Sequence, residues 1–145
     1  MTRLSNQNIH ATCVEKRGRA VLLAGPSGVG KSDLALQLVI DREFTLVSDD
    51  QTLVREKDGQ IRASAPPSIA GKIEIRGLGI FEMAMSDDVP VALYVDLAGQ
   101  VRRMPEEGET EELLGVHLPR IAIDGHTASA AAKVELALDR LGLDF

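Results

Sequence analysis

The chain has 145 residues, of which 44% are hydrophobic and 26% charged, so its composition is that of one ordinary globular domain and excludes a disordered chain. The net charge of -6 argues against general nucleic-acid binding, which requires a basic face. No apolar run has the length of a membrane span, the N-terminus lacks the apolar core of a signal peptide, and the single cysteine, Cys13, excludes an internal disulfide. We therefore expect a soluble, cytoplasmic protein.

The first predicted elements surround a glycine-rich segment. The run RAVLLA, Arg19–Ala24, lies between two glycines and predicts a buried strand. Apolar residues recur at helical spacing over Ser32–Ile40, which predicts a helix. The run FTLVSDD, residues 44–50, predicts a second strand that ends in two acidic residues.

Strands dominate the rest of the chain. Residues 51–65 predict a hairpin that turns at Lys57-Asp58-Gly59, and residues 72–83, 89–97 and 120–124 predict further strands. The segment Met104–Glu112 is acidic and predicts a solvated loop. A second long helix is expected over Thr127–Leu141, with an inward face composed of Ala131, Val134, Leu138 and Leu141 and a stop at Gly142. The expected fold is α/β, with a mixed β-sheet and few long helices.

The segment between the first strand and the first helix has the pattern of a phosphate-binding loop. Its spacing satisfies G-x-x-x-x-G-K-[ST], in which glycines let backbone N–H groups converge on an anion at a helix N-terminus. The lysine of this motif reaches the β- and γ-phosphates and its hydroxyl residue binds Mg²⁺. We expect the loop to bind a nucleoside triphosphate such as ATP through Gly25, Pro26, Ser27, Gly28, Val29, Gly30, Lys31 and Ser32.

Several acidic residues are candidates for the chemistry, and the sequence leaves the choice among them open. Phosphoryl transfer needs metal ligands and, when a hydroxyl attacks, a carboxylate that takes its proton. Asp96 ends a buried strand, as metal-binding acids often do, but aspartate also starts turns. Adjacent residues on an extended chain point to opposite sides, so we expect only one of Asp49 and Asp50 to face the phosphate. Glu74 alternates with apolar neighbours, which fits either a metal ligand or a solvent-facing strand residue.

Four segments in this order resemble the catalytic domain of bacterial HPr kinase/phosphorylase. They are IHATCVEKRGRAVLLAGPSGVGKSDLALQL, LVSDD, SAPPSIAGKIEIRGLGIFEM and LPRIAI. The combination of EIRGLG, the aspartate doublet and the phosphate loop is the most specific part of this resemblance, which runs from about His10 almost to the C-terminus.

The resemblance implies a function, a fold and an assembly. The family uses ATP or pyrophosphate to phosphorylate a serine of HPr, a small phosphocarrier protein of the phosphotransferase system that regulates carbon metabolism, and removes that phosphate by phosphorolysis. Its P-loop fold is similar to the nucleotide domain of phosphoenolpyruvate carboxykinase, and its members form hexamers. We accordingly expect a single catalytic domain over residues 1–145, an HPr-like partner and a homo-oligomer.

The resemblance also implies roles for individual residues. Asp50 would be the general base, with Asp49 as its supporting neighbour, and Glu74 would bind Mg²⁺ together with Ser32. His10 matches a histidine fifteen positions before the first glycine of the loop and would lie beside the catalytic aspartate, Asp50. Arg103 matches a catalytic arginine, although the adjacent Arg102 competes for that role.

The sequence departs from the family pattern in three places. The family usually carries an N-terminal domain, whereas this sequence starts just before the catalytic domain. A basic V-K-x-G-R segment tied to phosphorolysis is replaced by DGHTAS, residues 124–129, which weakens the expectation of the reverse reaction. The acidic loop after Met104 would repel an acidic partner, so the carrier would dock elsewhere or on a basic face that includes Lys72, Arg76 and Arg120.

Two other functions remain open at this stage. A small-molecule P-loop kinase would need a substrate pocket and an arginine-rich lid, for which 145 residues leave little room. A nucleotide-sensing regulatory module would bind ATP and signal through ordered loops without transferring phosphate. We favour the protein-serine kinase.

Overall fold

The computed structural model describes residues 6–145, which form two helices, eleven strands and one short 3₁₀ turn. The elements in chain order are β1 (Asn6–Ile9), β2 (Ala11–Lys16), β3 (Arg19–Ala24), α1 (Lys31–Asp41), β4 (Thr45–Ser48), β5 (Thr52–Lys57), β6 (Gln60–Ser64), η1 (Pro67–Ile69), β7 (Lys72–Ile75), β8 (Gly79–Glu82), β9 (Val89–Asp96), β10 (Thr110–Leu113), β11 (Val116–Ala122) and α2 (Ala130–Leu141).

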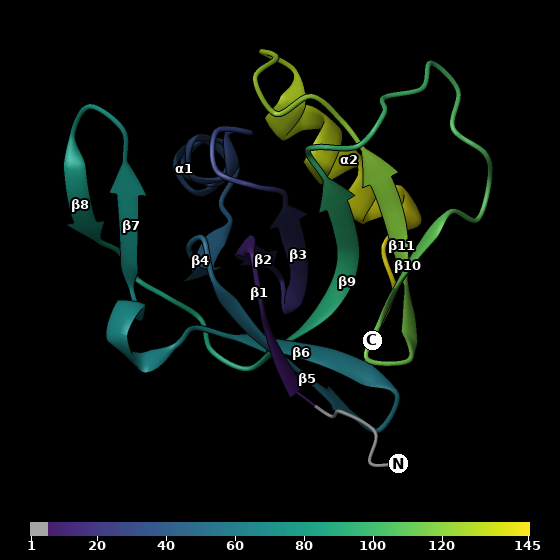
Figure 1. The fold of residues 1–145 in the computed structure, drawn as a ribbon, viewed down its shortest axis with the longest axis horizontal. Coiled ribbons are helices and arrows are strands. Elements are labelled where there is room, and N and C mark those ends of the chain that lie inside the picture. Colours follow the sequence, from purple (N-terminus) through teal and green to yellow (C-terminus); the bar gives the residue numbers. More distant parts are fainter. Residues whose placement is uncertain (1–5) are drawn as a thin grey trace.

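Nine strands form one curled, mixed sheet. Its order is β1-β5-β6-β9-β3-β2-β4, and β11, which carries β10 at its side, also pairs with β9. Strand β9 runs parallel to β3 and β11, whereas the other ladders of this sheet are antiparallel. The β7–β8 hairpin forms a separate two-stranded sheet that stands apart from the main sheet at the left of Figure 1. The predicted mixed α/β fold is confirmed.

The central strand β3 is buried on both faces. Val21 and Leu23 belong to one core cluster, which α1 and α2 cover, and Leu22 belongs to a second cluster on the other face. This second cluster is closed by residues of β5, β6 and β9, because the sheet curls over itself and no helix contributes to it. Burial on both faces explains why RAVLLA is a continuous apolar run without alternation.

Tight two-residue turns join three of the antiparallel pairs. Arg17-Gly18, Asp58-Gly59 and Leu114-Gly115 have positive φ at both positions, the conformation that matches the twist of paired strands. The Asp58-Gly59 turn lies where the sequence predicts it.

The predicted elements differ from the structure near the N-terminus and in the acidic segment. Strands β1 and β2 were not predicted; β2 is buried through Val14 and pairs with both β3 and β4. The acidic segment is a loop only in part, because Thr110–Leu113 forms β10, where Arg120 of β11 lies 3.4 Å from the Glu111 carboxylate.

The inward face predicted for the second helix is right at three of four positions. Ala131, Val134 and Leu138 are buried, but Leu141 is 57% exposed because it lies at the end of α2, beyond the part of the helix that packs on the sheet. Neither helix in residues 6–145 has the length and apolar character that crossing a bilayer requires.

Charged side chains fix α2 to the elements beside it. The Glu135 carboxylate lies 2.6 Å from Nζ of Lys16 on β2 and 3.1 Å from Nη1 of Arg42, the residue that caps α1. Hydrogen bonding from Lys16 holds the pKa of Glu135 below its ordinary value of 4.5, and Arg42 lowers it further. Ionisation of the Glu135 carboxylate therefore stabilises the folded state.

Substitutions at the end of α2 test which leucine is buried. We expect Leu138→Ala to lower the free energy of unfolding by about 2 to 5 kcal/mol, because the side chain is 2% exposed and its removal leaves a cavity. Leu141→Ala is the matched control on the same helix and should change it by less than about 0.5 kcal/mol. Urea unfolding measures both, and equal losses would contradict the assignment.

The Glu135 contacts predict a pH dependence of stability. Since the folded-state pKa lies below 4.5, the stabilisation is fully present above this value and is lost as the pH falls through the folded-state pKa. We expect Glu135→Gln to be less stable than the wild type by up to about 1 kcal/mol at pH 7. The difference between them should shrink below pH 4.5. Thermal melts from pH 7 to pH 3 measure it, and a constant difference would contradict the prediction.

Candidate active site

A cleft of about 610 Å³ opens where the first turn of α1, the end of β4 and the β7–β8 hairpin meet. The residues that line it come from the phosphate loop, the aspartate doublet, the hairpin and the segment before α2: Ser27, Gly28, Gly30, Lys31, Ser32, Asp33, Asp49, Asp50, Glu74, Ile75, Arg76, Gly77, Leu78, Gly79, Ile80 and His126. The two segments for which the sequence predicts phosphate chemistry therefore share one cavity.

The phosphate loop joins β3 to α1 and turns sharply at its glycines. Gly30 caps α1 with φ 87°, a left-handed conformation that places the first turn of the helix at the cleft. Lys31 is the first residue of α1 and is only 5% exposed. Its Nζ donates to the carbonyl of Gly25 at 2.5 Å and lies 3.4 Å from Oδ1 of Asp50.

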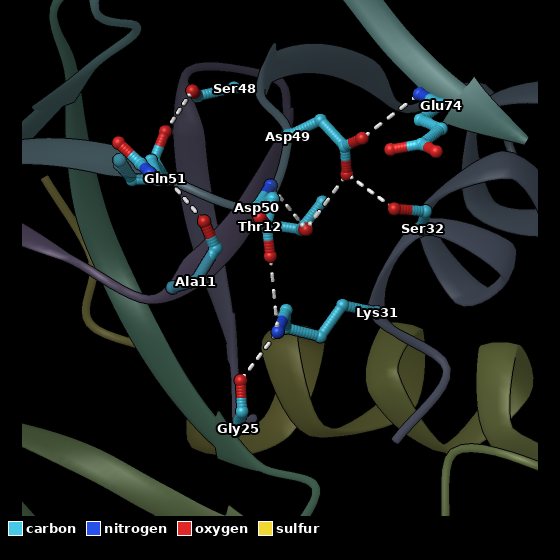
Figure 2. Close-up of polar contacts among 11 residues, drawn as sticks. Ala11, Thr12, Gly25, Lys31, Ser32, Ser48, Asp49, Asp50, Gln51 and Glu74 are labelled. Atoms are coloured by element: carbon cyan, nitrogen blue, oxygen red, sulfur yellow. Dashed lines mark hydrogen bonds and ion pairs between the residues drawn. The ribbon is translucent and has the colours of Figure 1, made fainter. Parts of the chain in front are cut away.

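Asp49 is the most highly connected side chain of the cleft. Its Oδ1 accepts hydrogen bonds from the hydroxyls of Thr12 at 3.0 Å and Ser32 at 2.6 Å, and its Oδ2 accepts the backbone N–H of Glu74 at 3.0 Å. Figure 2 shows these three donors arriving from β2, α1 and β7. Asp49 is 6% exposed, and the three hydrogen bonds satisfy a buried carboxylate. This residue therefore fixes the positions of three elements around the cleft.

Asp50 has a different environment from its neighbour. Its φ is 63°, so the chain is left-handed rather than extended at this position. The expectation that the two aspartates point to opposite sides is therefore wrong, and both line the cleft. The Asp50 side chain is 53% exposed, and Lys31 is the cation beside it. Its carboxylate is thus open to another molecule in the cleft, whereas that of Asp49 is enclosed.

Glu74 occupies an exposed position between buried residues of β7. Ile73 and Ile75 pack into the core, as the alternation predicts, and the Glu74 carboxylate is turned toward Asp49 and Ser32 (Figure 2). Ser32, Asp49 and Glu74 give this side of the cleft a set of oxygen donors, which is the chemistry that Mg²⁺ prefers. Within residues 6–145 no three Asp, Glu, His or Cys side chains gather as a metal site, so a cation here would take further oxygens from another molecule.

Two predicted site residues do not reach the cleft. His10 is exposed, and its backbone carbonyl accepts the N–H of Gly25 at 3.5 Å, so it lies beside the loop without lining the cavity. Arg103 is exposed in the segment between β9 and β10, which lies across the molecule from the hairpin in Figure 1. Arg102 lies 3.7 Å from Glu109 and does not line the cleft either.

The Asp96 carboxylate forms a salt bridge and starts a turn, and it does not line the cleft. One of its carboxylate oxygens accepts the guanidinium of Arg120 at 2.5 Å, and the other accepts the backbone N–H groups of Ala98 and Gly99. This is the turn-starting alternative that the sequence left open.

Sequence reasoning missed two residues at this site. His126 precedes α2, and its Nε2 lies 3.1 Å from the carbonyl of Gly28, while a β-carbon at Gly30 would come within 3.2 Å of its ring. Thr12 is fully buried beneath the aspartate doublet. The signal for Thr12 was a hydroxyl within the apolar run ATCV, because a buried hydroxyl requires a hydrogen-bond partner.

The sequence and the fold both match those of known proteins. The HPr Serine kinase C-terminal domain family matches residues 2–141. The chain is 38% identical to an HPr kinase/phosphorylase of Geobacillus thermodenitrificans over 79% of its own length and 41% of that protein's, and 36% identical to one of Geobacillus kaustophilus over 94% and 50%. It therefore spans about half or less of the length of these relatives. The structure of the Hpr(Ser) kinase/phosphatase from Coxiella burnetii superimposes with a TM-score of 0.76 and 26% identity, over 92% of this chain and 94% of that one.

The contrast between the two aspartates predicts different effects of the same substitution. Asp49→Asn has one acceptor oxygen for three donors, so we expect it to lower the free energy of unfolding by about 1 to 3 kcal/mol. Asp50→Asn should change it by less than about 0.5 kcal/mol, because that side chain is half exposed and asparagine tolerates a left-handed φ. Urea unfolding at pH 7 measures both. A larger loss for Asp50→Asn would contradict the burial described above.

Proposed function

The chain belongs to the HPr serine kinase C-terminal domain family, and on this basis we propose that it transfers the γ-phosphoryl group of ATP to a serine hydroxyl of an HPr-like phosphocarrier protein. The observation that carries the proposal is that the lysine and serine of the phosphate loop share one cleft with a buried and an open carboxylate. These are the groups that phosphoryl transfer to a hydroxyl requires.

The phosphate loop would bind the triphosphate of ATP. Backbone N–H groups of the loop and the N-terminus of α1 attract anions, and Lys31 adds a full positive charge at the same place. Lys31 already lies at the end of the loop, where its Nζ contacts Gly25 and Asp50 beside the cleft. These features support nucleotide binding at this end of the cleft.

Asp50 would accept the proton of the attacking serine. The serine oxygen forms a bond to the γ-phosphorus, the bond from that phosphorus to the β,γ-bridging oxygen breaks, and the serine proton passes to the Asp50 carboxylate, leaving ADP and phosphoserine. Asp49 is poorly suited to this role, because its carboxylate already accepts three hydrogen bonds. The exposure of Asp50 supports its assignment as the base.

Ser32 and Glu74 would hold Mg²⁺, and Asp49 would orient the hydroxyl of Ser32. Because Ser32 donates its hydroxyl proton to Asp49, its oxygen lone pairs remain free for a cation. When bound, Mg²⁺ would offset the charge of the β- and γ-phosphates. The oxygen donors of Ser32, Asp49 and Glu74 fit this ion.

Other parts of the proposal rest on the family alone. His10 beside the catalytic acid and Arg103 as a charge-stabilising residue remain predictions, since neither side chain lines the cleft. We also propose a single catalytic domain over residues 1–145, a hexameric assembly and a cytoplasmic location. Phosphorolysis is proposed only as a secondary activity, because residues 124–129 lack the basic segment associated with it.

Substitution of Asp50 tests the proposed transfer. With Mg·ATP and HPr from the same organism, we expect Asp50→Asn to lower kcat by about 10²- to 10⁴-fold, because the serine loses its base. Binding of ATP should be retained. Asp58→Asn is the matched control, since Asp58 also has a positive φ but lies in the β5–β6 turn. Phosphoserine formation is followed by mass spectrometry.

The same experiment separates this proposal from the alternatives. Transfer to HPr that is unaffected by Asp50→Asn would remove Asp50 from the mechanism. ATP binding without transfer by the wild type would favour a nucleotide-sensing module, and turnover of ATP with a small metabolite in the absence of HPr would favour a small-molecule kinase.

A further inference from the structure

Thr12 is a buried hydroxyl residue and the second residue of β2. Its neighbours Ala11 and Cys13 pack into the core cluster on one face of the sheet, and Thr12 faces the other side, where the aspartate doublet lies. The residue has no exposed surface, so it cannot touch a ligand directly. Its hydroxyl therefore acts only on other residues of the protein.

The hydroxyl forms one hydrogen bond to each aspartate. It donates to Oδ1 of Asp49 at 3.0 Å and accepts the backbone N–H of Asp50 at 2.9 Å, as Figure 2 shows. A hydroxyl has one proton and two lone pairs. The single proton is used on the Asp49 carboxylate, which leaves a lone pair for the Asp50 amide.

The two bonds fix different properties of the cleft. The bond to Asp49 shares Oδ1 with the hydroxyl of Ser32, so it holds the carboxylate oxygen that orients Ser32. The bond from the Asp50 N–H holds the backbone of a residue whose φ is 63°, a value that is uncommon for residues other than glycine. Without this acceptor, the backbone at Asp50 would keep only the local hydrogen bond from the Gln51 N–H to the Asp49 carbonyl at 2.7 Å, and the position of its carboxylate would be less constrained.

We propose that Thr12 is a positioning residue that holds the carboxylates of both aspartates in place. The Asp49 carboxylate is held so that it orients Ser32, and the Asp50 carboxylate so that it accepts the proton of the HPr serine. The proposal rests on the function proposed above and adds to it a residue outside the cleft. The competing explanation is that Thr12 is a core residue whose hydroxyl merely finds partners. The two explanations differ in whether the chemistry depends on the hydroxyl.

Three variants separate these explanations. Thr12→Val keeps the shape of the side chain and removes the hydroxyl, and Thr12→Ser restores the hydroxyl. Thr52→Val is the matched control, because Thr52 is equally buried and its hydroxyl donates to the carbonyl of Ala11 at 2.8 Å, without contacting either aspartate. All three are compared at equal folded fraction, which thermal melts establish.

The first measurement does not depend on transfer. Isothermal titration calorimetry gives the affinity for ATP with and without Mg²⁺. The affinity with Mg²⁺ divided by the affinity without it reports how well Ser32 is oriented. We expect Thr12→Val to lower this ratio about tenfold, as loss of a group that orients a metal ligand does, while Thr12→Ser and Thr52→Val leave it within about twofold. Amide exchange, followed by NMR, should show faster exchange of the Asp50 amide in Thr12→Val alone.

The second measurement is the kinetics of transfer to HPr. We expect Thr12→Val to lower kcat about 10- to 100-fold with little change in KM for HPr, and Thr12→Ser to recover most of the loss. If Thr12→Val loses stability as Thr52→Val does but keeps the Mg²⁺ ratio and kcat, the positioning role is overturned. If the wild type binds Mg·ATP but transfers nothing, the proposed function fails, and the Mg²⁺ ratio and the Asp50 amide still decide the role of Thr12.

Discussion

The geometry of the cleft depends on the hydrogen bonds that converge on the Asp49 carboxylate. Three separate elements donate to it: β2 through Thr12, α1 through Ser32 and β7 through the N–H of Glu74. A buried carboxylate is costly unless such donors satisfy it, so each element is held to the others by the same requirement. The phosphate loop and the β7–β8 hairpin belong to different parts of the fold, and these hydrogen bonds hold them at fixed positions on either side of one cavity.

The curled sheet brings these groups together from distant parts of the sequence. Strand β2 lies between β3 and β4, so that the strand leading into the phosphate loop and the strand leading into the aspartate doublet flank the strand that carries Thr12. The sheet also closes its own second core, which leaves both helices on the other face with the first turn of α1 at the cleft. Two helices are therefore enough to form the cleft that contains the phosphate loop.

The phosphate loop and most strands could be predicted because their signals are local. Gly25, Gly30 and Lys31 lie at a fixed spacing, and the alternation around Glu74 is read directly from neighbouring residues. The arrangement of the aspartates could not be predicted, since the backbone N–H of Asp50, a residue with a left-handed φ, donates to a hydroxyl 38 residues away in sequence. Thr12 was missed for the same reason: the partners of its hydroxyl lie in the turn after another strand, β4.

Lys31 contacts the carbonyl of its own loop and the Asp50 carboxylate. A bound phosphate that drew the ammonium away from these two partners would replace both contacts, and their free energy would be subtracted from the affinity for nucleotide. The same exchange would leave Asp50 without the cation that lies beside it. In the transfer proposed above, arrival of the phosphate would therefore remove the cation beside Asp50 before this carboxylate accepts the serine proton.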